Sequence, residues 1–158
     1  MRFSSVVLSF TSLLLTLVVV EGLLRLLPNP PIPLGIPDRD LGYIYRPHFS
    51  SRGINTESGR DVSVSINSFG FRDDEWDEHA RPNIMVVGDS FTSAEGVAEQ
   101  DRFTELLEAA LRKDGWAGRV LNLGIAGSGP EAYIERIRTY APALDPERVM
   151  VVIFNGND

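Results

Sequence analysis

Cysteine is absent from this chain, and histidine occurs only twice, at His48 and His79. Without cysteine the protein has neither disulfides nor thiolate metal sites. Two histidines far apart in the sequence also argue against a histidine-rich metal site. We therefore expect no metal and no other cofactor.

Basic residues are few, with 15 Lys and Arg against 22 Asp and Glu, so the net charge is −7. Nucleic-acid partners are bound through basic patches. The charge balance therefore excludes nucleic acid as the expected partner. The sequence shows no internal repeat on the scale of a domain.

Charge is also missing from Phe3 to Val20, a run of 18 residues rich in Leu and Val. As a helix this run spans about 27 Å, close to the ~30 Å hydrocarbon core of a bilayer. It is longer than the apolar core of a cleaved signal peptide, the alternative interpretation, and no Ala-x-Ala-like cleavage site follows. We predict an N-terminal anchor over residues 1–27 that contacts membrane lipid through residues 3–27. Arg2 favours a cytoplasmic N-terminus, so we expect a single-pass protein with its globular part outside the cytoplasm.

A proline-rich stretch and a predicted half-buried strand follow the anchor. Residues 28–37 hold five prolines and predict a semi-rigid spacer, which argues against a buried helix before it. Residues 38–80 form the next segment, in which Asp61 to Asn67 alternates polar and apolar residues as in a half-buried strand. A turn with aromatic side chains comes next. Packing, rather than stacking on carbohydrate, is expected for the aromatic residues Tyr43, Tyr45, Phe69 and Phe71.

Three apolar runs in residues 81–158 each end in small polar residues. They precede Gly88-Asp89-Ser90, the segment Gly124–Pro130, and Gly156-Asn157-Asp158. Helical patterns lie between them, from about Glu99 to Lys113 and from Pro130 to near Pro142. Strands that alternate with helices predict a parallel sheet covered by helices, and ligands collect at the carboxyl edge of such a sheet. On the second helix we expect Arg136 and Arg138 at the solvated surface.

The three strand ends resemble the sequence blocks of the SGNH, or GDSL-type, hydrolase superfamily over residues 84–158. The resemblance implies a three-layer α/β/α fold with a flavodoxin-like parallel sheet, of which residues 81–158 are the N-terminal part. It implies Ser90 as the nucleophile. It also implies an oxyanion hole made by the N–H groups of Ser90 and Gly127 and the side-chain amide of Asn157. Asp89 and Asp158 belong to the blocks as structural residues.

The chemistry of acyl transfer explains these residue types. Attack by serine produces a tetrahedral oxyanion, which needs donors fixed in advance. Glycine lets the backbone approach a ligand closely, and the amide of asparagine donates without carrying a charge. More weakly, residues 40–43 and 66–72 resemble the N-terminal extensions of membrane-anchored SGNH proteins.

Serine also needs an adjacent base, and the superfamily supplies it from an Asp-x-x-His block near the C-terminus of the domain. Here both histidines precede Ser90, and the chain ends at Asp158. His79 lies before the strand that leads to Ser90, on the order of 17 Å away at the other end of the sheet. His48 lies in a loop beside Pro47. We therefore expect an incomplete protein that lacks the base and has negligible esterase activity by itself.

The leading hypothesis is a membrane-anchored serine esterase that acts on an ester-bearing small molecule or an acylated surface carbohydrate. A polysaccharide O-acyltransferase with the same site and a non-catalytic truncated domain are the alternatives. A nucleotide-binding loop at Gly124-x-x-Gly127-x-Gly129 is disfavoured, because the glycine spacing differs from Gly-x-Gly-x-x-Gly and no phosphate-loop lysine is present.

Overall fold

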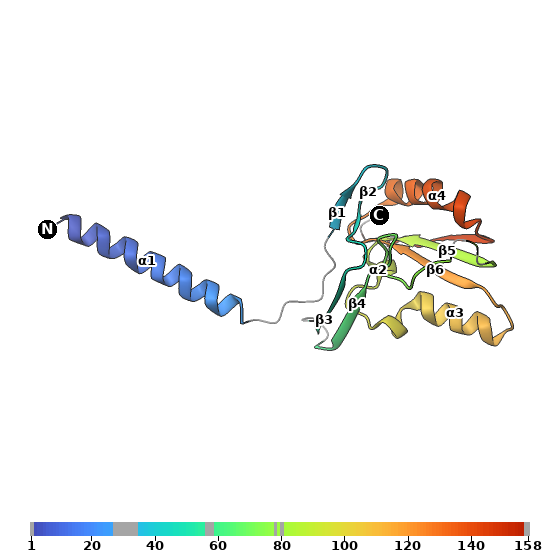
Figure 1. Cartoon of the computed structure of the whole chain (residues 1–158), viewed down its shortest axis with the longest axis horizontal. Helices are drawn as coiled ribbons and strands as arrows, with labels where there is room; N and C mark the ends of the chain where they lie inside the picture. The colour runs from blue at the N-terminus through green and yellow to red at the C-terminus, as the bar shows by residue number, and fades with distance from the viewer. Residues whose placement is uncertain (1, 27–34, 56–58, 78, 80, 157–158) are drawn as a thin grey trace.

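The computed structural model describes residues 2–26, 35–55, 59–77, 79 and 81–156. The first element is helix α1 (Arg2–Leu24), which stands apart from the rest of the protein (Figure 1). Its segment Val6–Leu24 has a mean hydropathy of 2.2, and none of it is buried. Arg25 pairs with Glu21 at 2.8 Å, as their spacing of four residues predicts. The helix is long and apolar enough to span a bilayer.

Two antiparallel hairpins follow α1. Strand β1 (Gly35–Asp38) pairs with β2 (Gly42–Tyr45), and β3 (Ser50–Ile54) pairs with β4 (Asp61–Ser65). The prediction of a half-buried strand is confirmed in β4, where Val62 and Val64 are buried between exposed neighbours. The other three strands were not expected, because β1 contains Pro37 and β3 does not alternate. Residues 35–37, assigned to the spacer from the sequence, lie in β1.

The predicted parallel sheet is present. Strands β5 (Asn83–Gly88), β6 (Arg119–Gly124) and β7 (Arg148–Val151) are parallel, in the order β6-β5-β7. Helices α3 (Phe103–Lys113) and α4 (Pro130–Leu144) connect them and pack against the sheet (Figure 1). The protein is therefore a mixed α/β fold with a three-stranded parallel sheet and one apolar N-terminal helix.

The two helices cover opposite faces of the sheet. Alternate residues of a strand point to opposite faces, and β5 divides its side chains accordingly. Met85 and Val87 join the cluster that contains Tyr133 and Leu144 of α4. Ile84 and Val86 join the cluster that is packed by side chains of α3. The larger cluster, on the α4 side, also takes in the two hairpins through buried side chains such as Tyr45, Val62 and Val64.

Both connecting helices differ from their predicted limits. Helix α3 begins at Phe103 rather than near Glu99, because residues 99–101 form a 3₁₀ turn and Arg102 is extended. Helix α4 runs through Pro142 and ends at Leu144. The last turn is retained because Leu144 is buried and its carbonyl accepts a hydrogen bond of 2.8 Å from Nδ2 of Asn83.

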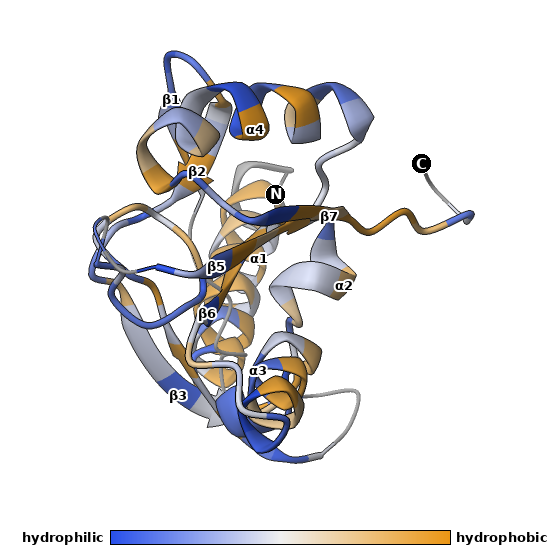
Figure 2. Cartoon of the chain, turned by 90° about the vertical axis from the view of Figure 1, so that its right-hand side faces the viewer, coloured by the Kyte–Doolittle hydropathy of each residue, from blue (hydrophilic) through white to orange (hydrophobic). Residues whose placement is uncertain are grey.

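Strand β7 is the exposed edge of the sheet. Val149, Met150 and Val151 keep 39–46% of their surface exposed, although their types suit a buried strand. Among the described strands it pairs with β5 alone, and the apolar colouring continues beyond it toward the C-terminus (Figure 2). Sequence pattern thus identified the strand, whereas its exposure follows from its place at the edge.

Candidate functional site

Ser90 lies immediately past the carboxyl end of β5, at the first residue of the short helix α2 (Ser90–Ser93). Asp89 caps this helix, since its Oδ1 accepts a hydrogen bond of 2.9 Å from the N–H of Phe91. The carboxylate of Asp89 is buried, whereas Ser90 is half-buried. Asp89 therefore has the structural role expected of it, and Ser90 stands where the sequence placed it.

Two strand-end glycines let α2 lie directly against the sheet. A Cβ atom on Gly88 would lie 2.0 Å from Oγ1 of Thr92, and one on Gly124 would lie 2.2 Å from the backbone nitrogen of Ser93. Real Cβ atoms are not found at such distances. The turn that carries Ser90 is thus seated on the ends of β5 and β6 with no space for a side chain beneath it.

Gly127 lies in the loop that follows β6. Gly88 and Gly124 are partners in the parallel register, so the loops that follow them leave the same edge of the sheet. The two loops are joined by a hydrogen bond of 3.2 Å from the N–H of Ile125 to the carbonyl of Gly88. Gly127 is exposed and has a φ of +72°, a conformation that favours glycine. The structure therefore brings Ser90 and Gly127 to one edge of the sheet.

The third predicted site residue, Asn157, lies with Asp158 outside the described residues. The segment that leads to it continues β7, because the N–H of Val152 donates to the carbonyl of Val87 at 2.9 Å. Two residues further on, the ring of Phe154 packs on Phe91 with 4.4 Å between ring centroids. Phe91 directly follows Ser90, so this contact brings the third strand end to the serine turn.

Backbone donors are free at this edge. Within the described part of the chain, neither the N–H of Ser90 nor that of Gly127 donates a hydrogen bond. An oxyanion site requires backbone donors that the fold leaves unpaired, and this edge offers two of them.

Two tyrosines of β2 hold the Gly127 loop from the other side. The Tyr43 hydroxyl donates to the carbonyl of Ala126, and the Tyr45 hydroxyl accepts from the N–H of the same residue at 2.8 Å. Tyr45 also contacts Ser93 Oγ at 3.0 Å and donates to Glu95 Oε1 at 2.8 Å. Burial is the main reason that the pKa of both phenols is raised, so both stay protonated at neutral pH.

Arg136 is buried, and the expectation that it lies at the solvated surface is wrong. Its Nη1 donates to the carbonyl of Gly88 at 2.9 Å and to that of Leu123 at 3.0 Å. Only 1% of Arg136 is exposed, and the described residues offer it no ion pair. Burial lowers the pKa of its guanidinium. The helical pattern placed it among polar residues, but these two strand-end carbonyls lie under α4 and require a donor.

A second buried arginine fixes the far end of the serine turn. Nη1 of Arg72 donates to the carbonyls of Ser93 and Ala94, and Nη2 donates to that of Val97 at 2.6 Å. The Ser93 carbonyl ends α2 and the other two follow it, so a cation faces the C-terminal end of that helix, where cations are favourable. Burial is the chief cause that lowers the pKa of Arg72 to about 10. Ser90 is therefore held on a turn that is fixed at both ends.

Neither histidine lies at this edge of the sheet. His48 is exposed and its Nδ1 lies 3.8 Å from Oε1 of Glu75. Glu75 lines a small hollow with Asn83 and Arg119, at the amino ends of β5 and β6. His79 is exposed and lies four residues before β5. The described structure therefore places both histidines at the opposite end of the sheet from Ser90, as the sequence predicts for His79.

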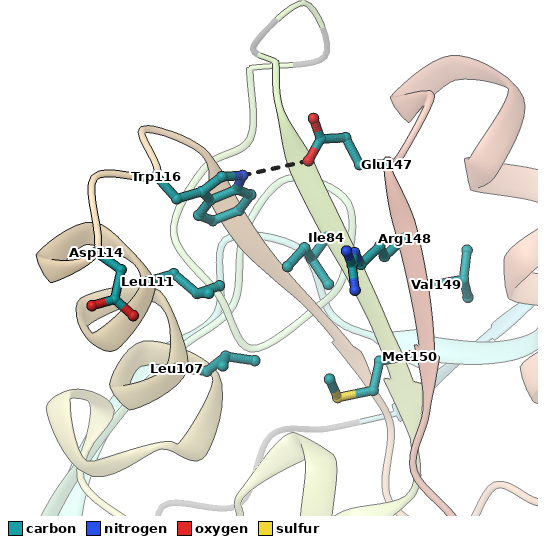
Figure 3. Close-up of a pocket in the computed structure, with 9 residues that line it drawn as sticks. All are labelled: Ile84, Leu107, Leu111, Asp114, Trp116, Glu147, Arg148, Val149 and Met150. Atoms are coloured by element: carbon teal, nitrogen blue, oxygen red, sulfur yellow. Dashed lines mark hydrogen bonds between the residues drawn. The ribbon is translucent and has the colours of Figure 1, made fainter.

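One apolar hollow also lies away from the serine. It has a volume of about 510 Å³ and lies between α3 and β7, with Ile84, Leu107 and Met150 among its lining residues (Figure 3). Trp116 closes one end through a hydrogen bond of 3.4 Å to Glu147. Neither Ser90 nor Gly127 lines it. Among the residues described, no three His, Asp or Glu side chains form a cluster that could hold a metal ion.

The sequence missed the contributions of Tyr43, Tyr45, Arg72 and Arg136. The tyrosines were expected to pack, and they do, but their hydroxyls also bind the site loop. Their spacing of two residues was the available signal, because it puts both on one face of a strand.

The chain matches no protein-family profile, no curated protein and no solved structure in the comparisons made.

Proposed function

We propose that this chain is the membrane-anchored, Ser90-bearing part of a serine esterase of SGNH type. The observation that carries the proposal is the meeting of Ser90 and Gly127 at the carboxyl edge of the parallel sheet, with both N–H groups unused. The proposal includes a flavodoxin-like three-layer arrangement for the complete domain. It rests on the chemistry of this edge and on the SGNH-like blocks.

In the proposed reaction, the Ser90 hydroxyl oxygen attacks the carbonyl carbon of an ester while a base removes its proton. The carbonyl oxygen becomes an oxyanion held by the N–H groups of Ser90 and Gly127 and by the amide of Asn157. The alcohol leaves as the acyl-enzyme forms, and water then releases the acid. The base is a histidine other than His48 and His79, since both lie at the other end of the sheet.

The test supplies the base from solution. The anchored chain in detergent micelles is treated with an alkyl fluorophosphonate, with and without imidazole, and the adduct is located by mass spectrometry. We expect slow labelling that imidazole accelerates and that is confined to Ser90. Ser90→Ala should remove the imidazole-dependent adduct, and Asn157→Ala should slow it by ~10²–10³-fold, the usual effect of losing one oxyanion donor.

Ser93 and Ser128 are the matched competitors in this experiment. Both are buried and hydrogen-bonded, Ser93 to Tyr45 and Ser128 to the carbonyl of Ile125 at 2.6 Å. An adduct on either one, with Ser90→Ala still reactive, would refute the assignment. Imidazole without effect on any serine would favour a non-catalytic domain.

We further propose that α1 anchors the protein with its globular part outside the cytoplasm. The proposal rests on the uncharged run Phe3–Val20 within α1 and on Arg2 before that run. Reporters that are active on only one side of the membrane, fused after the last residue, should signal from the outer side. Extraction at alkaline pH should leave the intact chain in the membrane. A cytoplasmic signal, or release of the intact chain, would contradict this topology.

A further inference from the structure

We infer that Tyr43 is a positioning residue that aims and polarises the N–H of Gly127. This inference rests on the proposed function, in which that N–H binds the oxyanion. The reasoning begins with the peptide group that joins Ala126 to Gly127, because its carbonyl and its N–H belong to one rigid plane.

A peptide group is planar and trans, so its carbonyl and its N–H point in opposite directions. The Tyr43 hydroxyl donates to the carbonyl of Ala126. Fixing that carbonyl toward Tyr43 therefore fixes the Gly127 N–H away from Tyr43. Within the described residues this N–H has no acceptor of its own, so nothing else in them sets its direction.

Tyr45 fixes the peptide on the other side of Ala126. Its hydroxyl has one proton, which goes to the carboxylate of Glu95 because a carboxylate only accepts. The oxygen then accepts from the N–H of Ala126 and from Oγ of Ser93. Tyr43 and Tyr45 thus hold the carbonyl and the N–H of one residue, and the Ala126 backbone has little freedom to rotate.

The hydroxyl of Tyr43 lies close to the glycine itself. A Cβ atom on Gly127 would lie 3.3 Å from the Tyr43 oxygen, tighter than most real contacts. A hydrogen bond to the carbonyl also draws electron density toward that end of the peptide group, which makes the N–H a better donor. The phenol keeps its proton for this role, because burial raises its pKa.

The peptide group between Ala126 and Gly127 can be observed selectively by isotope labelling. Ala followed by Gly occurs at only two places, Ala117-Gly118 and Ala126-Gly127. In the full chain in micelles, ¹³C-carbonyl alanine combined with ¹⁵N-glycine leaves two signals in a carbonyl-selected spectrum. In Tyr43→Phe we expect the Ala126 carbonyl and the Gly127 amide to shift, while the Ala117-Gly118 pair stays in place.

The functional readout is the rate of the imidazole-dependent adduct on Ser90. Losing an oxyanion donor costs ~10²–10³-fold, so a donor that is present but misdirected should slow the reaction of Tyr43→Phe by about tenfold. The concentration of reagent that gives half-maximal rate should change little, because the donor acts in the transition state. Tyr133→Phe is the matched control, since its hydroxyl donates to the carbonyl of Ser128 at 3.1 Å, two residues further along the same loop.

Three results would overturn the inference. The first is a Gly127 signal that does not move in Tyr43→Phe. The second is a signal that moves while the rate at Ser90 stays within twofold of the parent. The third is an equal loss of rate in Tyr133→Phe, which would indicate general loosening of the loop. Absence of any Ser90 adduct in the parent chain would instead refute the proposed function, and the spectrum alone would then show whether Tyr43 orients the peptide.

Discussion

Gly124→Ala should lower the free energy of unfolding by about 3 kcal/mol or more, at the upper end of the cost of overpacking. The added methyl group would lie 2.2 Å from the nitrogen of Ser93 and 2.5 Å from the carbonyl carbon of Thr92. Both are backbone atoms of α2, so no side chain can turn aside to relieve the contact. Urea unfolding followed by tryptophan fluorescence measures the effect, because Trp76 and Trp116 both lie outside α1.

Gly129→Ala is the matched control for this change. A Cβ atom at Gly129 meets nothing within 4 Å, and the φ of −117° suits any residue. Because Gly129 is the N-cap of α4, where alanine is a poorer cap, we expect a loss below about 1 kcal/mol. Equal stability of the two variants would show that α2 is not seated on the end of β6.

Arg136→Met should cost about 2–4 kcal/mol, since hydrogen bonds from a charged group contribute ~1.5–3 kcal/mol and the buried acceptors lose a partner. Methionine keeps much of the apolar stem but removes the donors to Gly88 and Leu123. The Gly88 carbonyl keeps its hydrogen bond from the N–H of Ile125, so the substitution should destabilise the fold without abolishing it. The same fluorescence measurement applies.

Arg138→Met, two residues further along α4, is the control. Arg138 is exposed, and its one ion pair within the described part of the chain is with Glu135, one turn away, at 2.7 Å. Exposed pairs of this kind contribute a few tenths of a kcal/mol. A comparable loss in both arginine variants would point to helix propensity, and not to the buried hydrogen bonds, as the cause.

Local patterns were enough to predict much of this fold. Apolar runs that end in Gly-Asp-Ser and in Gly-x-x-Gly placed β5, β6 and the residues that follow them, because strand ends depend on nearby residues. The half-buried strand β4 could be predicted in the same way, because Val62 and Val64 alternate with polar neighbours. For the same reason the meeting of Ser90 and Gly127 at one edge could be predicted.

Contacts between distant segments could not be predicted from such patterns. Tyr43 and Ala126 are 83 residues apart, and no local rule brings them together. Arg136 looked like a surface residue because its helix gives no sign of two carbonyls beneath it. The exposure of Val149 was hidden too, since it depends on how many strands flank β7 and not on its own residue type.

The hairpin of β1 and β2, which holds the Gly127 loop, is also the first described element after α1. Nine Cα-to-Cα steps separate Leu26 from Gly35, a reach of at most about 32 Å. With α1 in a bilayer, the hairpin is therefore confined to a thin layer above the membrane, and Ser90 with it. A site tethered in this way samples an area instead of a volume, so its encounters would depend on how densely a ligand covers the membrane and hardly at all on the ligand's concentration in the surrounding fluid.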